Sequence, residues 1–142
     1  MGVQDKRAAF LQLFFISISL QQIITMLKFA AVVCFIAMSY LFFMPAANIP
    51  KIHWMEIIFF DKWVHLGLFA LFVGVSTLAF ANPEVNNTHI RLLLAAILYG
   101  IVVEIIQFYF IKGRSFSIYD ILADTLGALI GAKWAYKLQR KQ

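Results

Sequence analysis

The chain has few charged side chains and few of the residues that break helices. Only 13% of its 142 residues are charged, and it contains seven glycines and three prolines. Soluble domains carry about a quarter charged residues. A water-soluble fold of this length could not bury so many apolar side chains, which make up 63% of the total. This composition excludes a soluble enzyme or a secreted domain and favours a membrane protein of one compact domain.

Cysteine and acidic residues are also scarce. The single cysteine, Cys34, lies in an apolar run, so it cannot form an intramolecular disulfide and reveals nothing about redox compartment. Lysine and arginine outnumber the acidic residues by 12 to 7, which gives a formal net charge of +5. The basic residues sit at the ends of apolar runs. They therefore indicate orientation in a membrane and contact with anionic lipid headgroups, not binding to nucleic acid.

What the chain has in abundance is long apolar runs. Four of them approach the roughly 20 residues that a membrane-spanning helix needs. The runs are too long for transmembrane strands and lack period-two alternation. We therefore predict an all-α membrane protein with a bundle of four transmembrane helices. The expected spans are residues 29–44, 63–80, 92–111 and 118–138.

The first 25 residues are apolar but interrupted by glutamines and serines. No small-residue cleavage site follows them, as a signal peptide requires. Nothing between Thr25 and Phe29 supplies a turn, so a separate span is not expected here. We interpret residues 1–25 as an N-terminal interfacial helix that leads into a four-helix domain over residues 26–142. Translation from Met26, with the first 25 residues not made, is an open alternative.

The distribution of lysine and arginine predicts the orientation. With the N-terminus in the cytoplasm, eight basic residues lie on the inner side and four on the outer side. Because cytoplasmic loops carry the excess of basic residues, this arrangement is the favoured one. We expect a multi-pass protein of the plasma (inner) membrane with both termini cytoplasmic. The four outer residues are Lys51, Lys62, Lys112 and Arg114.

Polar and ionisable side chains gather near one end of three predicted spans. At about 1.5 Å rise per residue, His65, Glu104 and Asp124 lie roughly 5–10 Å inside the span ends, on the side that the charge count makes the outer one. Intramembrane ionisable residues are costly and usually face a bundle interior or a water-filled cavity. We therefore predict one polar cavity that opens to the outer side. Its residues are Lys62, His65, Glu104, Gln107, Arg114, Ser117, Asp120 and Asp124.

Chemical roles can be assigned to this set as hypotheses. The catalytic candidates are His65, Glu104 and Asp120, with His65 as the group that handles a proton. The candidates for binding a substrate or an anion are Lys62, Gln107, Arg114 and Ser117, and Arg114 is expected to pair with the carboxylates.

Asp61 and Asp124 complete this set of polar residues. The simpler interpretation is that these charges neutralise one another and lock the helices together, and that Asp61 caps a helix. No cofactor and no metal is predicted, because the residues that could bind a metal lack a recognised spacing motif. A metal-binding variant stays an alternative, since the chain offers suitable ligands in Asp61, His65, Glu104, Asp120 and Asp124.

Three glycines lie on the same helix faces as the polar residues. Gly127 and Gly131 continue the stripe that begins with Asp120 and Asp124, and they form a GxxxG pattern. This pattern permits close helix approach in membranes. Gly100 lies one turn before Glu104. We predict that all three glycines pack against other helices.

The same residues carry a resemblance to a known family. The segments DKWVH (61–65), EIIQ (104–107) and RSFSIYDILADTLGALIG (114–131) match, in order and spacing, a pattern of the VanZ-like family. That pattern is D-K-x-x-H, then E-x-x-Q, then R-x-x-S-x-x-D-x-x-x-N/D-x-x-G-x-x-x-G. The chain resembles the family from about Met26 to Trp134. Asp124 stands where many relatives have asparagine.

The resemblance implies a bacterial cell-envelope protein that contributes to glycopeptide resistance of the teicoplanin type. Three functions stay open: a non-enzymatic envelope factor, a membrane-embedded acid/base enzyme acting on a lipid-linked envelope substrate, and a small ion-coupled carrier. Whether the chain is an enzyme is therefore undecided by the sequence. The expected partners are membrane lipids and an envelope precursor or a glycopeptide-related ligand, with a homo-oligomer as a further option and no nucleic acid.

Overall fold

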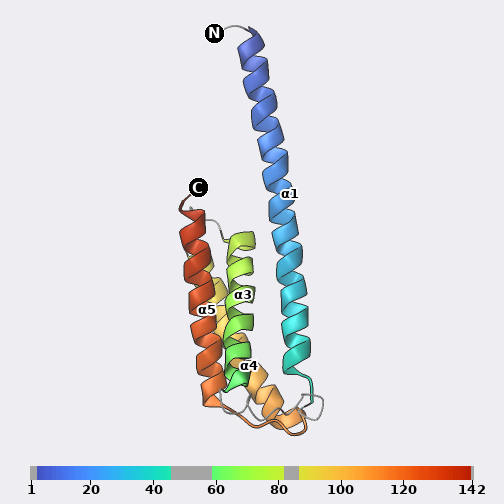
Figure 1. The fold of residues 1–142 in the computed structure, drawn as a ribbon, viewed down its shortest axis with the longest axis vertical. Helices are drawn as coiled ribbons and strands as arrows, with labels where there is room; N and C mark the ends of the chain where they lie inside the picture. Colours follow the sequence, from blue (N-terminus) through green and yellow to red (C-terminus); the bar gives the residue numbers. More distant parts are fainter. Residues whose placement is uncertain (1–2, 46–58, 82–86, 142) are drawn as a thin grey trace.

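The computed structural model describes residues 3–45, 59–81 and 87–141. All regular secondary structure in this described part is α-helical, which confirms the prediction of an all-α protein. Successive helices run in opposite directions (Figure 1). The end of α1, the start of α3, the end of α4 and the start of α5 therefore lie at one end of the bundle. The helices are α1 (Val3–Phe42), α3 (Phe60–Phe80), α4 (Thr88–Phe110) and α5 (Ile118–Gln139).

The helix ends follow local signals in the sequence. Residues 3–44 contain neither glycine nor proline, and α1 ends just before Pro45. α3 ends at Phe80, shortly before the Asn82-Pro83 pair. α5 begins after Ser117, whose side-chain Oγ accepts a hydrogen bond from the backbone N–H of Asp120 at 3.3 Å. This is the bond expected of an N-cap serine.

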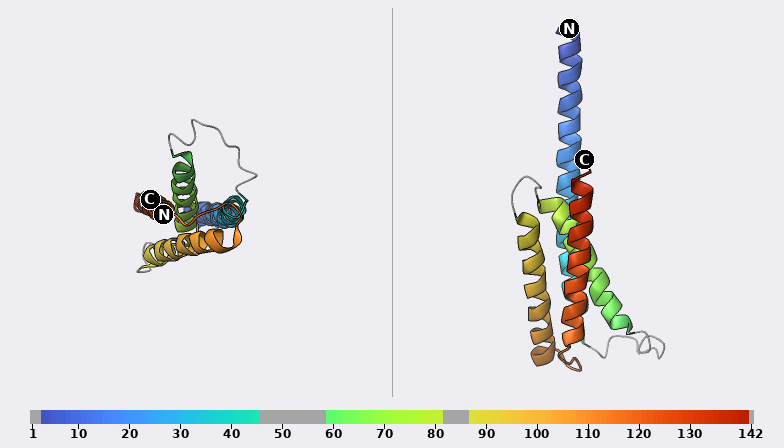
Figure 2. Two further views of the ribbon diagram at one scale, coloured as in Figure 1. Left: turned by 90° about the horizontal axis from the view of Figure 1, so that it is seen from below. Right: turned by 90° about the vertical axis from the view of Figure 1, so that its left-hand side faces the viewer.

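α1 is an unbroken helix of 40 residues. At about 1.5 Å per residue its length is roughly 60 Å, about twice the hydrocarbon thickness of a bilayer. Its N-terminal half extends beyond the other helices (Figures 1 and 2) and carries exposed apolar side chains such as Phe10 and Phe15. The helix passes through Met26 without a break. The predicted boundary at that residue is therefore not a boundary of secondary structure.

Three of the described helices are long and apolar enough to cross a membrane. They are Phe10–Phe42 within α1, Phe60–Phe80 and Thr88–Phe110. α5 has a comparable length but a lower apolar content, since it carries Asp120, Asp124, Lys133 and Lys137. Both aspartates are buried, whereas both lysines lie nearer the opposite end of α5 and are at least partly exposed. The membrane character of the chain therefore comes chiefly from α1, α3 and α4.

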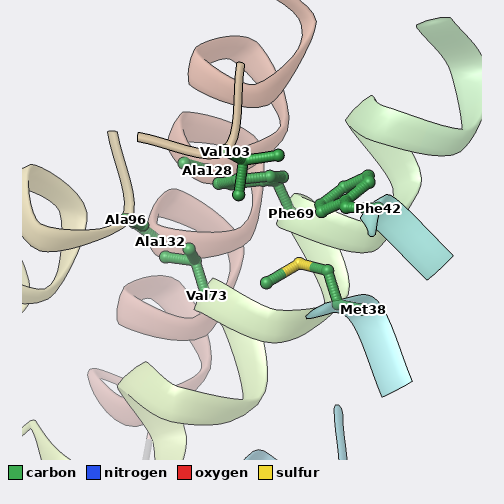
Figure 3. Close-up of a cluster of buried hydrophobic side chains, with 8 residues drawn as sticks. All are labelled: Met38, Phe42, Phe69, Val73, Ala96, Val103, Ala128 and Ala132. Atoms are coloured by element: carbon green, nitrogen blue, oxygen red, sulfur yellow. The ribbon is translucent and has the colours of Figure 1, made fainter. Parts of the chain in front are cut away.

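α3 lies at the centre of the packing. It contacts α5 most extensively, followed by α1, and α4 packs mainly against α5. α3 is tilted relative to α5 (Figure 2). The buried apolar side chains come from all four helices (Figure 3), and Phe69 at the centre of α3 is fully buried. The cluster consists of Met38, Phe42, Phe69, Val73, Ala96, Val103, Ala128 and Ala132.

Two glycines of α5 allow it to lie against the α3 backbone. A Cβ atom on Gly127 would overlap the carbonyl group of Leu66. A Cβ atom on Gly131 would overlap the carbonyl oxygen of Ala70 and approach the backbone nitrogen of Gly74 to 2.9 Å. Since these neighbours are backbone atoms, they cannot rotate away as a side chain could. The close contact between the helices therefore requires glycine at both positions.

Gly131→Ala should lower the stability of the folded protein, by about 1–3 kcal/mol as for an overpacked core. Gly67→Ala is the matched control, because Gly67 lies in α3 with nothing within 4 Å of its Cβ position. Replacing a mid-helix glycine with alanine there should raise stability by roughly 0.5–1 kcal/mol. Thermal unfolding of the two variants in detergent gives the comparison. Equal melting temperatures would contradict close packing through Gly131.

Candidate functional site

The polar residues singled out in the sequence gather where α3, α4 and α5 meet near the end formed by the 111–117 segment. His65 and Asp124 are buried, as are Glu104, Gln107 and Asp120. Lys62, Arg114 and Ser117 are partly buried at the edge, and Asp61 is exposed. We call His65, Glu104, Asp120 and Asp124, together with Lys62, the polar cluster. It draws on three helices that lie far apart in the sequence.

His65 is held between two helices. Its Nδ1 atom lies 2.9 Å from Oδ1 of Asp124, and both side chains are almost fully buried. On its other side the imidazole ring stacks on the ring of Phe42, with 4.5 Å between centroids. With Asp124 ionised, Nδ1 donates the proton of this hydrogen bond, so Nε2 carries the free lone pair. Nε2 is then the atom available to accept a proton or to bind a ligand.

Lys62 joins α3 to α5 at the edge of the cluster. Its Nζ atom donates to Oδ1 of Asp120 at 2.6 Å and to Oδ2 of Asp61 at 2.7 Å. The side chain of Asp120 is 12% exposed and that of Asp61 is 54% exposed. The pair with Asp120 is therefore the better shielded from water and the stronger contribution to helix docking.

Glu104 connects α4 to the start of α5. It is fully buried, and its Oε2 atom accepts a hydrogen bond from the backbone N–H of Ser117 at 2.9 Å. A carboxylate is favoured beside a helix N-terminus, where unpaired N–H groups and the helix dipole attract negative charge. The second oxygen, Oε1, is buried without a hydrogen-bond partner. An unpartnered buried carboxylate oxygen is costly, which makes Glu104 a candidate for binding an ion or a ligand.

Arg114 does not occupy the position expected from the sequence. It forms no ion pair with any acidic group in the described part of the chain, and its Nε atom is buried without a partner. Lys62 occupies the place beside Asp120 instead. The physical reason is the orientation of α3, which points Lys62 towards α5. Arg114 therefore remains a cation without a carboxylate partner among the described residues.

Two contacts to α1 could not be read from the sequence pattern. Gln107 donates through Nε2 to the backbone carbonyl of Phe42 at 2.8 Å. The hydroxyl groups of Ser39 and Tyr99 lie 2.8 Å apart. The carbonyl of Phe42 cannot be recognised as an acceptor from the sequence, because every residue has a carbonyl. Ser39 and Tyr99 do carry a signal, since they are hydroxyl residues inside apolar runs, but that signal does not show that they meet. These bonds attach the end of α1 to α4 beside the polar cluster.

Gly100 brings α4 close to Asp124. A Cβ atom on Gly100 would lie 2.8 Å from Oδ2 of Asp124 and 3.3 Å from the ring of Phe69. Oδ2 is itself buried without a hydrogen-bond partner. Gly100 therefore leaves the room that the carboxylate of Asp124 needs.

A cavity of about 160 Å³ lies deeper along α1, α3 and α4. Its lining is almost wholly apolar, and it includes Tyr99 and Ser76 but no residue of the polar cluster. This cavity is thus distinct from the outer polar cavity predicted from the sequence.

The fold and the cluster define a helical membrane protein with ionisable residues buried near one end of its bundle. The chain belongs to the VanZ/LLP1 family, whose model matches residues 5–139. This match confirms the family resemblance and starts well before Met26, where the resemblance drawn from motifs began. No curated protein and no solved structure matches the chain.

The pair of His65 and Asp124 predicts a difference between two substitutions. Asp124→Asn keeps an oxygen that can accept from His65, so the variant should stay folded with little loss of stability. Asp124→Leu leaves a buried imidazole N–H unpaired and should cost about 1–3 kcal/mol. Thermal unfolding in detergent would measure both. A leucine variant as stable as the asparagine variant would show that the hydrogen bond does not hold α3 against α5.

Proposed function

We propose that the chain crosses the bacterial plasma membrane four times, with both termini in the cytoplasm. α5 matches the other helices in length and packs along α3, so it would share their membrane environment. Its buried aspartates face the bundle, and Lys133 and Lys137 can extend to a lipid surface. Arg91, Arg140 and Lys141 lie at the same end, which favours that end as the cytoplasmic one. Lys51, one of the outer residues in the charge count, lies outside the described residues.

We further propose that residues 1–25 lie at the cytoplasmic membrane surface. The part of α1 from Met26 to Phe42 is about 25 Å long, close to the hydrocarbon thickness of a bilayer. The apolar residues before it would be exposed to water if the helix continued straight out of the membrane. Contact with the lipid surface avoids this cost. It requires α1, which the structure shows as one unbroken helix, to bend near Met26 in the membrane.

Cysteine labelling tests this arrangement, starting from a Cys34→Ala background. Ser115→Cys should react with an impermeant thiol reagent in intact cells, because Ser115 is exposed in the segment between α4 and α5. Arg140→Cys should react only after permeabilisation. A fluorophore on Ile18→Cys should be quenched by lipids brominated near the headgroup. Labelling of Arg140→Cys in intact cells would reverse the orientation, and quenching only at the bilayer centre would exclude the interfacial placement.

At the level of the cell, we propose that the protein reduces sensitivity to glycopeptides of the teicoplanin type, and that the polar cluster is its working site. The observation that carries this proposal is the burial of Glu104 and Asp124 with one oxygen of each left unpaired. Helix docking alone does not need unpaired buried oxygens, which lower stability. Family membership supports the envelope role. The ligand would be an envelope precursor or a glycopeptide-related molecule.

A membrane-embedded acid/base enzyme is the second candidate, and the contact between His65 and Asp124 favours it. A carboxylate that orients an imidazole and leaves its second nitrogen free is a common arrangement for a general base. Lys62 and Arg114 at the edge could hold an anionic group of a lipid-linked substrate. On this proposal His65→Ala would abolish turnover of such a substrate by the folded protein.

Glu104→Gln and Arg114→Ala should each abolish the glycopeptide phenotype at matched protein level. Both variants should fold. In Glu104→Gln the side-chain amide oxygen can still accept the hydrogen bond from the Ser117 N–H. Arg114→Ala removes no ion pair with a described residue, because Arg114 forms none. The measurement is the teicoplanin concentration that inhibits growth of a sensitive strain expressing each variant. Lys112→Ala, which removes an exposed cation two residues from Arg114, should keep the phenotype of the unaltered chain. Full resistance in both Glu104→Gln and Arg114→Ala would reduce the polar cluster to a helix-docking network.

A further inference from the structure

We infer that His65, Glu104 and Asp120 bind a divalent transition-metal ion. One potential ligand atom from each of these residues lies within 4.8 Å of the other two, and all three side chains are buried. Ligand atoms around a bound ion lie about 3–4 Å apart when each metal–ligand bond is about 2.0–2.2 Å. Small side-chain rotations would close the remaining gap. The sequence showed no metal motif because the three residues come from three different helices.

Each of the three residues has an atom left over for the ion. The Nδ1 atom of His65 is occupied by Asp124, which leaves Nε2. Oε2 of Glu104 accepts from Ser117, which leaves Oε1. Oδ1 of Asp120 accepts from Lys62, which leaves Oδ2. Every ligand group is thus oriented by a hydrogen bond through its other atom, as is usual for residues that bind metals.

An unpartnered oxygen of Glu104 provides a second and independent observation. Oε1 of Glu104 has no hydrogen-bond partner although the residue is 0% exposed. Buried polar atoms are rarely left in this state, and a bound ion is one of the recognised explanations. Oε1 belongs to one of the three residues whose ligand atoms converge. The unpaired oxygen is therefore accounted for by the same ion that the distances suggest.

The charges in the cluster agree with a divalent ion. Glu104, Asp120 and Asp124 are three buried carboxylates, and Lys62 is the one cation paired with them in the described structure. When all three carboxylates are ionised, His65 is neutral and Lys62 is set against Asp120, two negative charges remain among the buried groups. Asp61, the other partner of Lys62, is exposed and is left out of this sum. A divalent cation supplies the matching positive charge and removes the main cost of keeping these groups ionised in an apolar environment.

The mixture of ligand types narrows the choice of ion. An imidazole nitrogen favours zinc, iron and other transition metals, whereas carboxylate oxygens also suit manganese. Calcium prefers six to eight oxygen ligands and does not fit this set. Three protein ligands leave a coordination position open for water or a substrate group. The site would thus accept Zn²⁺ or Mn²⁺, with water or a substrate group in the open position.

Metal binding can be tested on the purified full-length chain in detergent. The protein is treated with a chelator, incubated with Zn²⁺ or Mn²⁺, desalted and assayed for metal by mass spectrometry. The unaltered chain should retain a single ion and gain thermal stability from it. Glu104→Gln and His65→Gln should retain none. Asp124→Asn, which alters only the group that orients His65, should weaken binding about 10–100-fold.

His89→Ala is the matched control, since His89 contacts Tyr136 and takes no part in the cluster. This variant should bind metal as the unaltered chain does. The inference is wrong if the unaltered chain retains no more metal than Glu104→Gln, or if His89→Ala loses as much as His65→Gln. The site coincides with the working site proposed above, but metal content is measured without any phenotype. Metal binding without a glycopeptide phenotype would overturn only the proposed function.

Discussion

The close approach of α3 and α5 determines how the buried polar groups of these two helices are paired. Gly127 and Gly131 let α5 reach the backbone of α3 at Leu66 and Ala70, close to His65 along the helix. The same register brings Asp124 to His65 and Asp120 to Lys62. If the helices were held a side-chain width further apart, both contacts would be lost, and the carboxylates of Asp120 and Asp124 would have no partner on α3. Packing and electrostatics therefore depend on the same two glycines.

Much of the fold follows from features that are local in the sequence. Apolar runs and the breaks at Pro45 and Asn82-Pro83 predict the helices, because a helix depends on hydrogen bonds between near neighbours. The stripe from Asp120 to Gly131 likewise predicts one face of α5, because residues four apart share a face. Family membership could also be recognised from motif spacing, and the match over residues 5–139 confirms it. These predictions needed no knowledge of how the helices meet.

The contacts between helices could not be predicted in the same way. Helical spacing does not say how far each helix is rotated about its axis, so it could not decide between Lys62 and Arg114 as the partner of Asp120. Nor could it show that Gln107 would bond a backbone carbonyl, which every residue possesses. The sequence already groups His65, Glu104 and Asp120 near one end of the bundle. Since each residue lies on a different helix, only the three-dimensional distances show that one ligand atom from each lies within 4.8 Å of the others.

The end of α1 has a consequence for how that helix can move. Its surface is mostly apolar, and lipid alone would let such a helix slide along its axis at little cost. Phe42 prevents this, because its ring stacks on His65 while its carbonyl accepts from Gln107. One turn earlier, Ser39 is bonded to Tyr99. A displacement of one residue, about 1.5 Å, would strain all three contacts at once. These contacts therefore favour one axial position of α1, and a force that pulls on this helix is transmitted through Phe42 to the ring of His65.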